Sequence, residues 1–129
     1  MTRKLYEYTE LTKLERAFLI YVFKHTQLPI DEGNMPFVVF KGIKYDDNTG
    51  FTKNQVMGIA SSLVQKGIIR TYLDDSCAWR DENGRFQEGM TENVKIYGDY
   101  VEKYICEDKY FKLKGMGAVL TQEGMEVDA

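Results

Sequence analysis

Several features that would mark a membrane protein, a metalloprotein or a common enzyme are missing from this sequence. Its 129 residues contain no run near the roughly 18 apolar residues of a membrane span, and the N-terminus lacks the apolar segment of a signal peptide. The one histidine, His25, has no catalytic motif around it, and the two cysteines have no metal-binding spacing. We therefore expect a cytoplasmic, non-enzymatic protein with no cofactor, no bound metal and no membrane association, in which Cys77 and Cys106 are reduced.

The composition is that of a folded domain with an uneven charge. Hydrophobic residues make up 43% of the chain, aromatic residues 13% and charged residues 29%, which lies in the globular range. The length suits one domain, residues 1–129. The net charge of −3 disfavours a simple basic nucleic-acid binder, but residues 1–72 carry ten Lys or Arg and seven Asp or Glu, against seven and thirteen in residues 73–129. An anionic ligand would therefore bind the first half.

Two segments of the first half have the spacing of amphipathic helices. In residues 12–27, Thr12 and Glu15 form the pattern of a capping box, and in residues 52–66 Thr52 is a suitable N-cap. The apolar positions that recur at helical spacing, and so predict the buried stripes, are Leu11, Leu14, Phe18, Tyr21 and Val22 in the first helix and Val56, Ile59, Ala60, Leu63 and Val64 in the second.

The segments around the second helix favour β structure. Residues 30–50 contain PFVVFKGI, which fits a strand or a short stretch of helix, and both interpretations stay open. Residues 68–73 are β-branched and aromatic, which predicts a strand that ends at Asp74. Further on, Asn83 and Gly84 are the residues that favour a hairpin with a two-residue loop.

The last third of the chain contains a second ambiguous segment. Residues 93–105 fit a hairpin that turns at Gly98 and Asp99, or a helix that aligns their apolar residues. The glycine favours the hairpin. Residues 110–121 alternate well enough for a strand with a bend, and residues 122–129 have the composition of a loose tail.

The segment LVQKGIIR, a helix end that runs straight into a strand, and the later segment VLTQEG resemble parts of the winged helix-turn-helix superfamily, with a MarR-like character. This resemblance implies an α+β, winged-helix-like domain with N-terminal helices and a β-rich C-terminal half that elaborates the wing. It also implies that residues 52–66 form a recognition helix for the major groove of double-stranded DNA, and that residues 74–110 are an insertion between two candidate wing strands.

The face of the second helix that lies opposite its apolar stripe is polar, which suits a DNA-binding regulator of transcription. Asn and Gln side chains bind adenine edges, serine binds bases or phosphates, and a glycine allows close approach of the backbone. Lysine and arginine neutralise phosphates. A solvated helix surface, with the glycine placed for helix packing, is the alternative. The candidate nucleic-acid-binding residues are Lys53, Asn54, Gln55, Gly58, Ser61, Ser62, Gln65, Lys66 and Arg70.

A second hypothesis is a protein-binding winged-helix module, such as a small phage- or plasmid-encoded modulator of a host transcription or defence complex. The second half of the chain is acidic and rich in aromatic residues, and Tyr and Trp are enriched in the centres of protein interfaces. The same aromatic residues would otherwise form the core of a small β-sheet. The candidate partner-binding residues are Trp79, Phe86, Tyr97, Tyr100 and Tyr104.

Overall fold

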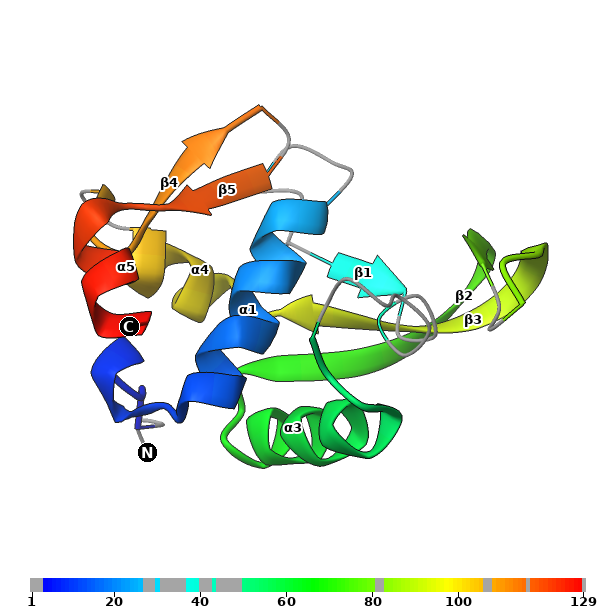
Figure 1. Cartoon of the computed structure of the whole chain (residues 1–129), viewed down its shortest axis with the longest axis horizontal. Coiled ribbons are helices and arrows are strands. Elements are labelled where there is room, and N and C mark those ends of the chain that lie inside the picture. Colours follow the sequence, from blue (N-terminus) through cyan, green and yellow to red (C-terminus); the bar gives the residue numbers. More distant parts are fainter. Residues whose placement is uncertain are drawn as a thin grey trace.

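Helices and strands are mixed along the chain (Figure 1). The computed structural model describes residues 4–26, 30, 37–39, 43, 50–80, 83–105, 108–115 and 117–128, with the backbone alone for residues 37–39, 75–80 and 128. This architecture confirms the expected α+β class. The elements in chain order are η1 (Tyr8–Glu10), α1 (Lys13–His25), β1 (Phe37–Val39), α3 (Lys53–Gln65), β2 (Ile69–Arg80), β3 (Phe86–Ile96), α4 (Gly98–Ile105), β4 (Phe111–Lys114), β5 (Gly117–Leu120) and α5 (Gln122–Asp128).

The larger of two antiparallel sheets has the strand order β1-β3-β2. In its central strand β3, Val94 lies opposite Val38 of β1 and Thr71 of β2. Both α1 and α3 contact this sheet. Figure 1 shows α3 below the sheet and the far end of the β2–β3 hairpin projecting beyond the other elements. The smaller sheet, β4-β5, lies at the opposite end of the molecule with α4 and α5.

Both predicted helices are confirmed, because α1 and α3 begin where the capping patterns placed them. The Thr12 Oγ1 accepts the Glu15 N–H at 3.1 Å, and the Glu15 Oε1 accepts the Thr12 N–H at 2.9 Å. Thr52 and Gln55 form the same two hydrogen bonds at the start of α3. At its other end α3 is followed by Gly67, whose φ of +72° is one that glycine adopts without strain.

Most predicted positions of the two buried stripes are buried, but Tyr21 is only half-buried, and α1 also buries Leu19 and Phe23, which the prediction left out. Phe18 of α1 and Leu63 of α3 are fully buried, as expected. Leu14 and Val64 are exposed at 42% and 44%, so their assignment to the buried stripes is wrong. A helix turns by about 100° per residue, so Val64 lies on the flank of α3 when Leu63 points into the core.

A cluster of aromatic rings fills the core between the N-terminal segment, α4 and β4. We name Tyr8, Tyr100, Tyr104 and Tyr110, together with Phe111, the tyrosine cluster. The Tyr8 ring centroid lies 4.8 Å from that of Tyr110, 5.5 Å from that of Tyr104 and 5.6 Å from that of Phe111. All five side chains are buried.

Two hydrogen bonds join the tyrosine cluster to the N-terminal segment. The Tyr100 Oη accepts the Tyr6 N–H at 2.9 Å, and the Tyr104 O–H donates to the Tyr6 carbonyl at 2.9 Å. Burial raises the pKa of Tyr104, with a further contribution from the nearby Tyr100, so its hydroxyl keeps the proton that it donates. The chain start is therefore held against α4 by backbone groups as well as by rings.

The structure corrects three β predictions. The strand β2 continues past Asp74 to Arg80, with an irregularity in register between Asp74 and Cys77. Its hairpin with β3 is confirmed, but the last pair is Arg80 with Phe86, so the loop is longer than two residues. The hairpin predicted at Gly98 is wrong, because α4 begins there. This helix buries two tyrosine rings of the cluster, and that packing outweighs the cost of a terminal glycine.

The partner of β2 also differs from the expectation for residues 74–110. β2 pairs with β3, which lies inside that range, whereas β4 pairs with β5 in a separate sheet. The range is therefore not an insertion between two paired wing strands. The C-terminal segment expected to be a loose tail forms α5. For residues 30–50, the strand alternative is correct at Phe37–Val39. Ile43 is helical and buried, and the extent of that helix falls outside the described residues.

Candidate functional site

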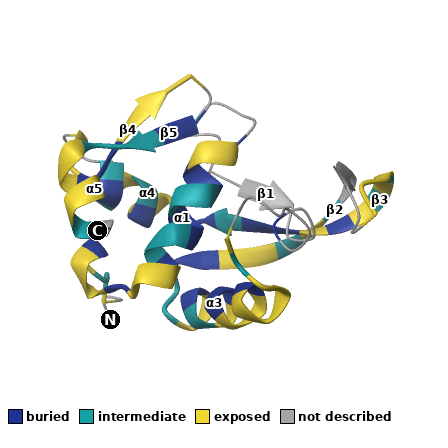
Figure 2. Cartoon of the chain, in the orientation of Figure 1, coloured by how far each residue is buried: buried dark blue, intermediate teal, exposed yellow. Residues whose placement is uncertain are grey.

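The outward face of α3 presents a polar surface with some apolar side chains. Of the nine candidate nucleic-acid-binding residues, six are exposed on this helix: Lys53, Asn54, Gln55, Gly58, Ser61 and Gln65. No carboxylate occurs among the residues of α3, so nothing on the helix itself repels an anion. Figure 2 shows the exposed side of α3 facing away from the sheet. Two apolar side chains of α3, Met57 and Val64, are also exposed; the prediction placed Val64 in the buried stripe and gave Met57 no role.

Three candidates on α3 or at its end make structural contacts: the exposed Gln55 and the half-buried Ser62 and Lys66. The Gln55 Oε1 accepts the Thr52 N–H at 2.9 Å as part of the helix cap. Ser62 and Lys66 both turn toward α1 and contact the side chain of Glu15. The prediction that Ser62 lies on the outward face and Lys66 at its edge is therefore wrong, because the helical wheel does not show that a buried carboxylate on another helix lies on that flank.

Glu15 is the polar link between α1 and α3. Its side chain is buried, with a residue exposure of 2%. The Lys66 Nζ lies 2.7 Å from both carboxylate oxygens, and the Ser62 Oγ donates to Glu15 Oε2 at 2.8 Å. The capping box places Glu15 at the first turn of α1 and could have suggested a structural role for it. The fold sets its distant partners, Lys66 and Ser62, so the sequence pattern does not reveal them.

The pKa of Glu15 reflects a balance of burial and hydrogen bonding. Burial alone would raise the pKa of this carboxyl. The hydrogen bonds from Lys66, from the Thr12 backbone N–H and from Ser62 outweigh the burial and hold the pKa below its ordinary value. Glu15 therefore stays ionised near neutral pH, and the ion pair fixes the last turn of α3 on α1.

The ninth candidate, Arg70, lies on β2 and faces away from the α3 side of the sheet. Its neighbour Ile69 is buried, and successive side chains on a strand point to opposite faces. Arg70 lies opposite Lys95 of β3, and both cations approach the ring of Tyr72, at 6.0 Å and 4.8 Å. Burial and the charge of Arg70 lower the pKa of Lys95. Arg70 therefore belongs to a basic pair on the sheet, separate from the polar face of α3.

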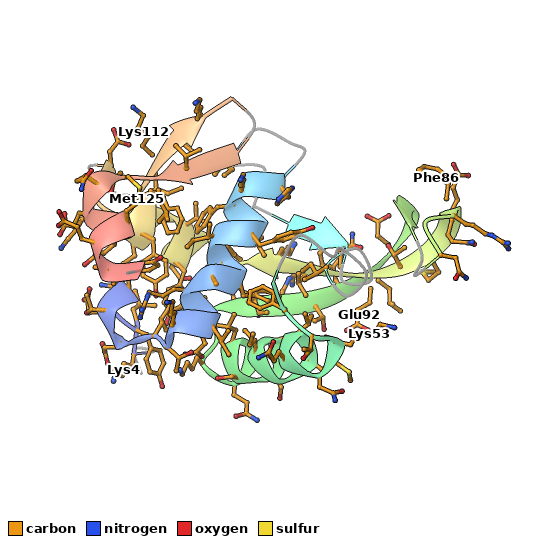
Figure 3. All side chains as sticks on the ribbon, viewed as in Figure 1. Lys4, Lys53, Phe86, Glu92, Lys112 and Met125 are labelled. Atoms are coloured by element: carbon orange, nitrogen blue, oxygen red, sulfur yellow. The ribbon has the colours of Figure 1, made fainter. Side chains whose placement is uncertain are left out.

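The five candidate partner-binding residues do not form one surface. Tyr100 and Tyr104 are buried in the tyrosine cluster, so their assignment to an exposed surface is wrong. Tyr97 is half-buried at the end of β3. Phe86 is exposed at 61%, at the far end of the projecting hairpin (Figure 3). The side chain of Trp79 lies outside the described residues.

The remaining sequence predictions concern His25, metal binding, membrane association and the two cysteines. His25 stacks on Tyr21 with ring centroids 4.2 Å apart, at the end of α1. Within the described residues, no group of three or more His, Cys, Asp or Glu side chains could hold a metal ion. No described helix combines the length and the apolar character needed to cross a membrane. The thiols of Cys77 and Cys106 fall outside the described side chains.

Comparison of the chain with family models, with curated proteins and with solved structures found no match.

Proposed function

We propose that this protein is a winged-helix-like module that binds double-stranded DNA through the outward face of α3. The observation that carries the proposal is the path of the chain from α3 directly into the β2–β3 hairpin, within a sheet of order β1-β3-β2. In winged helix-turn-helix domains the recognition helix is followed by the strands of the wing. The resemblance of LVQKGIIR to that family thus agrees with the position of α3, with β2 and β3 as the two wing strands.

The polar side chains of α3 have the spacing that a groove-reading helix needs. Asn54, Ser61 and Gln65 are exposed at intervals of seven and four residues, which places them on one side of the helix. They span about 16 Å along the axis at 1.5 Å per residue, enough to follow several base pairs of a major groove about 12 Å wide. Amide side chains at either end offer paired donors and acceptors to adenine.

The charge around α3 predicts a small electrostatic contribution to DNA affinity. Lys53 is exposed at the start of α3. Lys66 is paired with Glu15, and Arg70 points to the other sheet face. Glu88 and Glu92 on the projecting hairpin would repel phosphates. We therefore expect the duplex to contact α3 alone, with a shallow dependence of affinity on salt, corresponding to one or two neutralised phosphates.

Duplex affinity of four single variants tests this proposal. Lys53→Ala should weaken binding to every sequence and flatten the salt dependence. Lys112→Ala removes the same charge from the distant strand β4 and should change nothing (Figure 3). Asn54→Ala and Gln65→Ala should each reduce the preference between sequences by about 1–3 kcal/mol if that residue makes a bidentate base contact. Failure of the unaltered protein to bind mixed duplexes at low salt would reject the proposal.

Gly58 allows a second, independent test of close DNA approach. A Cβ at this position would meet nothing within 4 Å, so the protein alone does not require a glycine there. Gly58→Ala should raise the free energy of unfolding by about 1 kcal/mol through helix propensity. If the α3 backbone approaches DNA closely, the same variant binds duplex less tightly although it is more stable. Unchanged affinity would show that α3 does not approach the groove at Gly58.

A further inference from the structure

The projecting part of the β2–β3 hairpin, residues 73–92, which we name the arm, has one face that is both apolar and acidic. Side chains alternate along a strand, so Phe86, Glu88, Met90 and Glu92 of β3 point to the same face. Leu73 of β2 lies opposite Glu92 and joins that face. All five side chains are exposed.

This face continues the core face of the sheet beyond the body of the molecule. Val94 and Ile96 follow Glu92 at the same alternation and are fully buried where α1 and α3 cover the sheet. Leu73, Met90 and Phe86 are exposed at 71%, 62% and 61%, the three highest values among the large apolar side chains that the structure describes. Exposed apolar side chains gathered on one face are a common mark of a protein interface.

The charge of the arm restricts what can bind there. Residues 73–92 contain six carboxylates and two arginines, for a net charge of −4. On the exposed face, Glu88 and Glu92 alternate with Phe86 and Met90. Phosphates of DNA and anionic lipid headgroups would be repelled by these carboxylates. A ligand for this face must present apolar groups together with positive charge.

We propose that this face of the arm is a docking surface for a basic, amphipathic segment of a protein partner. Apolar side chains of that segment would cover Leu73, Phe86 and Met90, and its lysine or arginine side chains would pair with Glu88 and Glu92. This surface is distinct from the polar face of α3, so the arm would recruit a protein while α3 contacts DNA. Of the partner-binding residues predicted from sequence, only Phe86 belongs to this face. Tyr100 and Tyr104 lie in the core, and Tyr97 is half-buried at the end of β3, away from the arm.

Three synthetic peptides of equal length test the partner chemistry with the full chain. One alternates Leu with Lys, the second Leu with Glu, and the third Ser with Lys. Fluorescence anisotropy of a labelled peptide gives each affinity, and amide shifts in NMR spectra of the protein locate the binding. The Leu–Lys peptide should bind and shift arm amides, whereas the other two should bind at least roughly tenfold more weakly.

Single variants decide whether the face itself binds the Leu–Lys peptide. Phe86→Ala and Met90→Ala should each weaken binding roughly tenfold, and Glu88→Gln should weaken it less and flatten its salt dependence. Leu113→Ala removes an apolar side chain, 50% exposed, from β4 and should leave the affinity unchanged. Circular dichroism checks that each variant remains folded.

Three outcomes would overturn the docking proposal. The first is equal affinity of the Leu–Lys and Leu–Glu peptides. The second is equal binding by the unaltered protein and Phe86→Ala, or amide shifts confined to residues away from the arm. The third is a concentration-dependent dimer in sedimentation velocity that Phe86→Ala converts to monomer, because a second copy of this chain would then be the occupant. DNA affinity of the α3 variants is measured separately, so the two proposals fail independently.

Discussion

The tyrosine cluster and the arm draw on similar residues and use them in opposite ways. Both contain large apolar or aromatic side chains near acidic residues, and apart from Tyr8 of the cluster these side chains belong to the second half of the chain. In the cluster, Tyr100 and Tyr104 are fully buried against the N-terminal segment. On the arm, Phe86 and Met90 are more than half exposed. Composition alone therefore does not separate core from surface here, because the separation depends on which segments return to cover each region.

The largest difference in stability effect between the tyrosine cluster and the arm is expected for substitutions of Tyr104. Tyr104→Ala should lower the free energy of unfolding by about 3–5 kcal/mol, since a fully buried ring is lost and a cavity remains among the neighbouring rings. Tyr104→Phe keeps the ring and loses only the hydrogen bond to the Tyr6 carbonyl, at a cost of about 0.5–1.5 kcal/mol. Urea unfolding followed by circular dichroism measures both. A loss below 1 kcal/mol for Tyr104→Ala would contradict the cluster as core.

Local patterns in the sequence identify the elements whose ends are fixed by neighbouring residues. Thr12 and Thr52 cap α1 and α3 through residues three positions further on, so the sequence pattern contains both partners of each cap. The helix α4 depends on distant partners instead. Its tyrosines form hydrogen bonds with the backbone of Tyr6, 94 and 98 residues away along the chain. A prediction from neighbouring residues does not include these contacts, so it followed the glycine and favoured a hairpin.

The sequence likewise predicted only part of the candidate site. The periodicity of α3 identified its outward residues Asn54, Ser61 and Gln65, because exposure on a helix follows from spacing. It did not identify the contacts of Ser62 and Lys66, because their partner Glu15 lies about 50 residues earlier in the chain. The apolar face of the arm was also missed, since nothing in a strand's alternation says that the covering layer ends before its tip.

The next largest loss of stability is expected at Gly124, where α5 packs closely against Tyr110 of the tyrosine cluster. A Cβ on Gly124 of α5 would lie 2.3 Å from the Tyr110 carbonyl oxygen and 2.8 Å from Leu120 Cδ2. Gly124→Ala should therefore destabilise by about 1–3 kcal/mol, because backbone at that position must shift. Gly58→Ala is the matched helical control, where the added methyl meets open space and the stability should rise. Equal stability changes in the two variants would contradict the packing of α5 on Tyr110.

The ion pair between α1 and α3 should have an intermediate, pH-dependent effect. The pKa of Glu15 is lower in the folded state than its ordinary value, so this group contributes stability above its unfolded pKa and loses it as pH falls through the folded one. Glu15→Gln should cost about 1–2 kcal/mol at pH 7 and show a smaller loss of stability from roughly pH 4.3 downward. Glu7→Gln, at an exposed ion pair with Lys103, is the control. Parallel pH profiles for the unaltered protein and Glu15→Gln would disprove this role.

The smallest stability effect is expected on the arm, at Phe86. Its side chain is 61% exposed, so Phe86→Ala removes little buried area and should change the free energy of unfolding by less than about 0.5 kcal/mol. The contrast with Tyr104→Ala then exceeds 2 kcal/mol, although both substitutions delete an aromatic ring. The docking proposal requires such a near-neutral result, because a partner can cover the Phe86 ring only if the ring is exposed in the free protein. If Phe86→Ala instead destabilises by more than 1 kcal/mol in urea unfolding, the arm is folded over by another part of the protein, and its apolar face is not available to a partner.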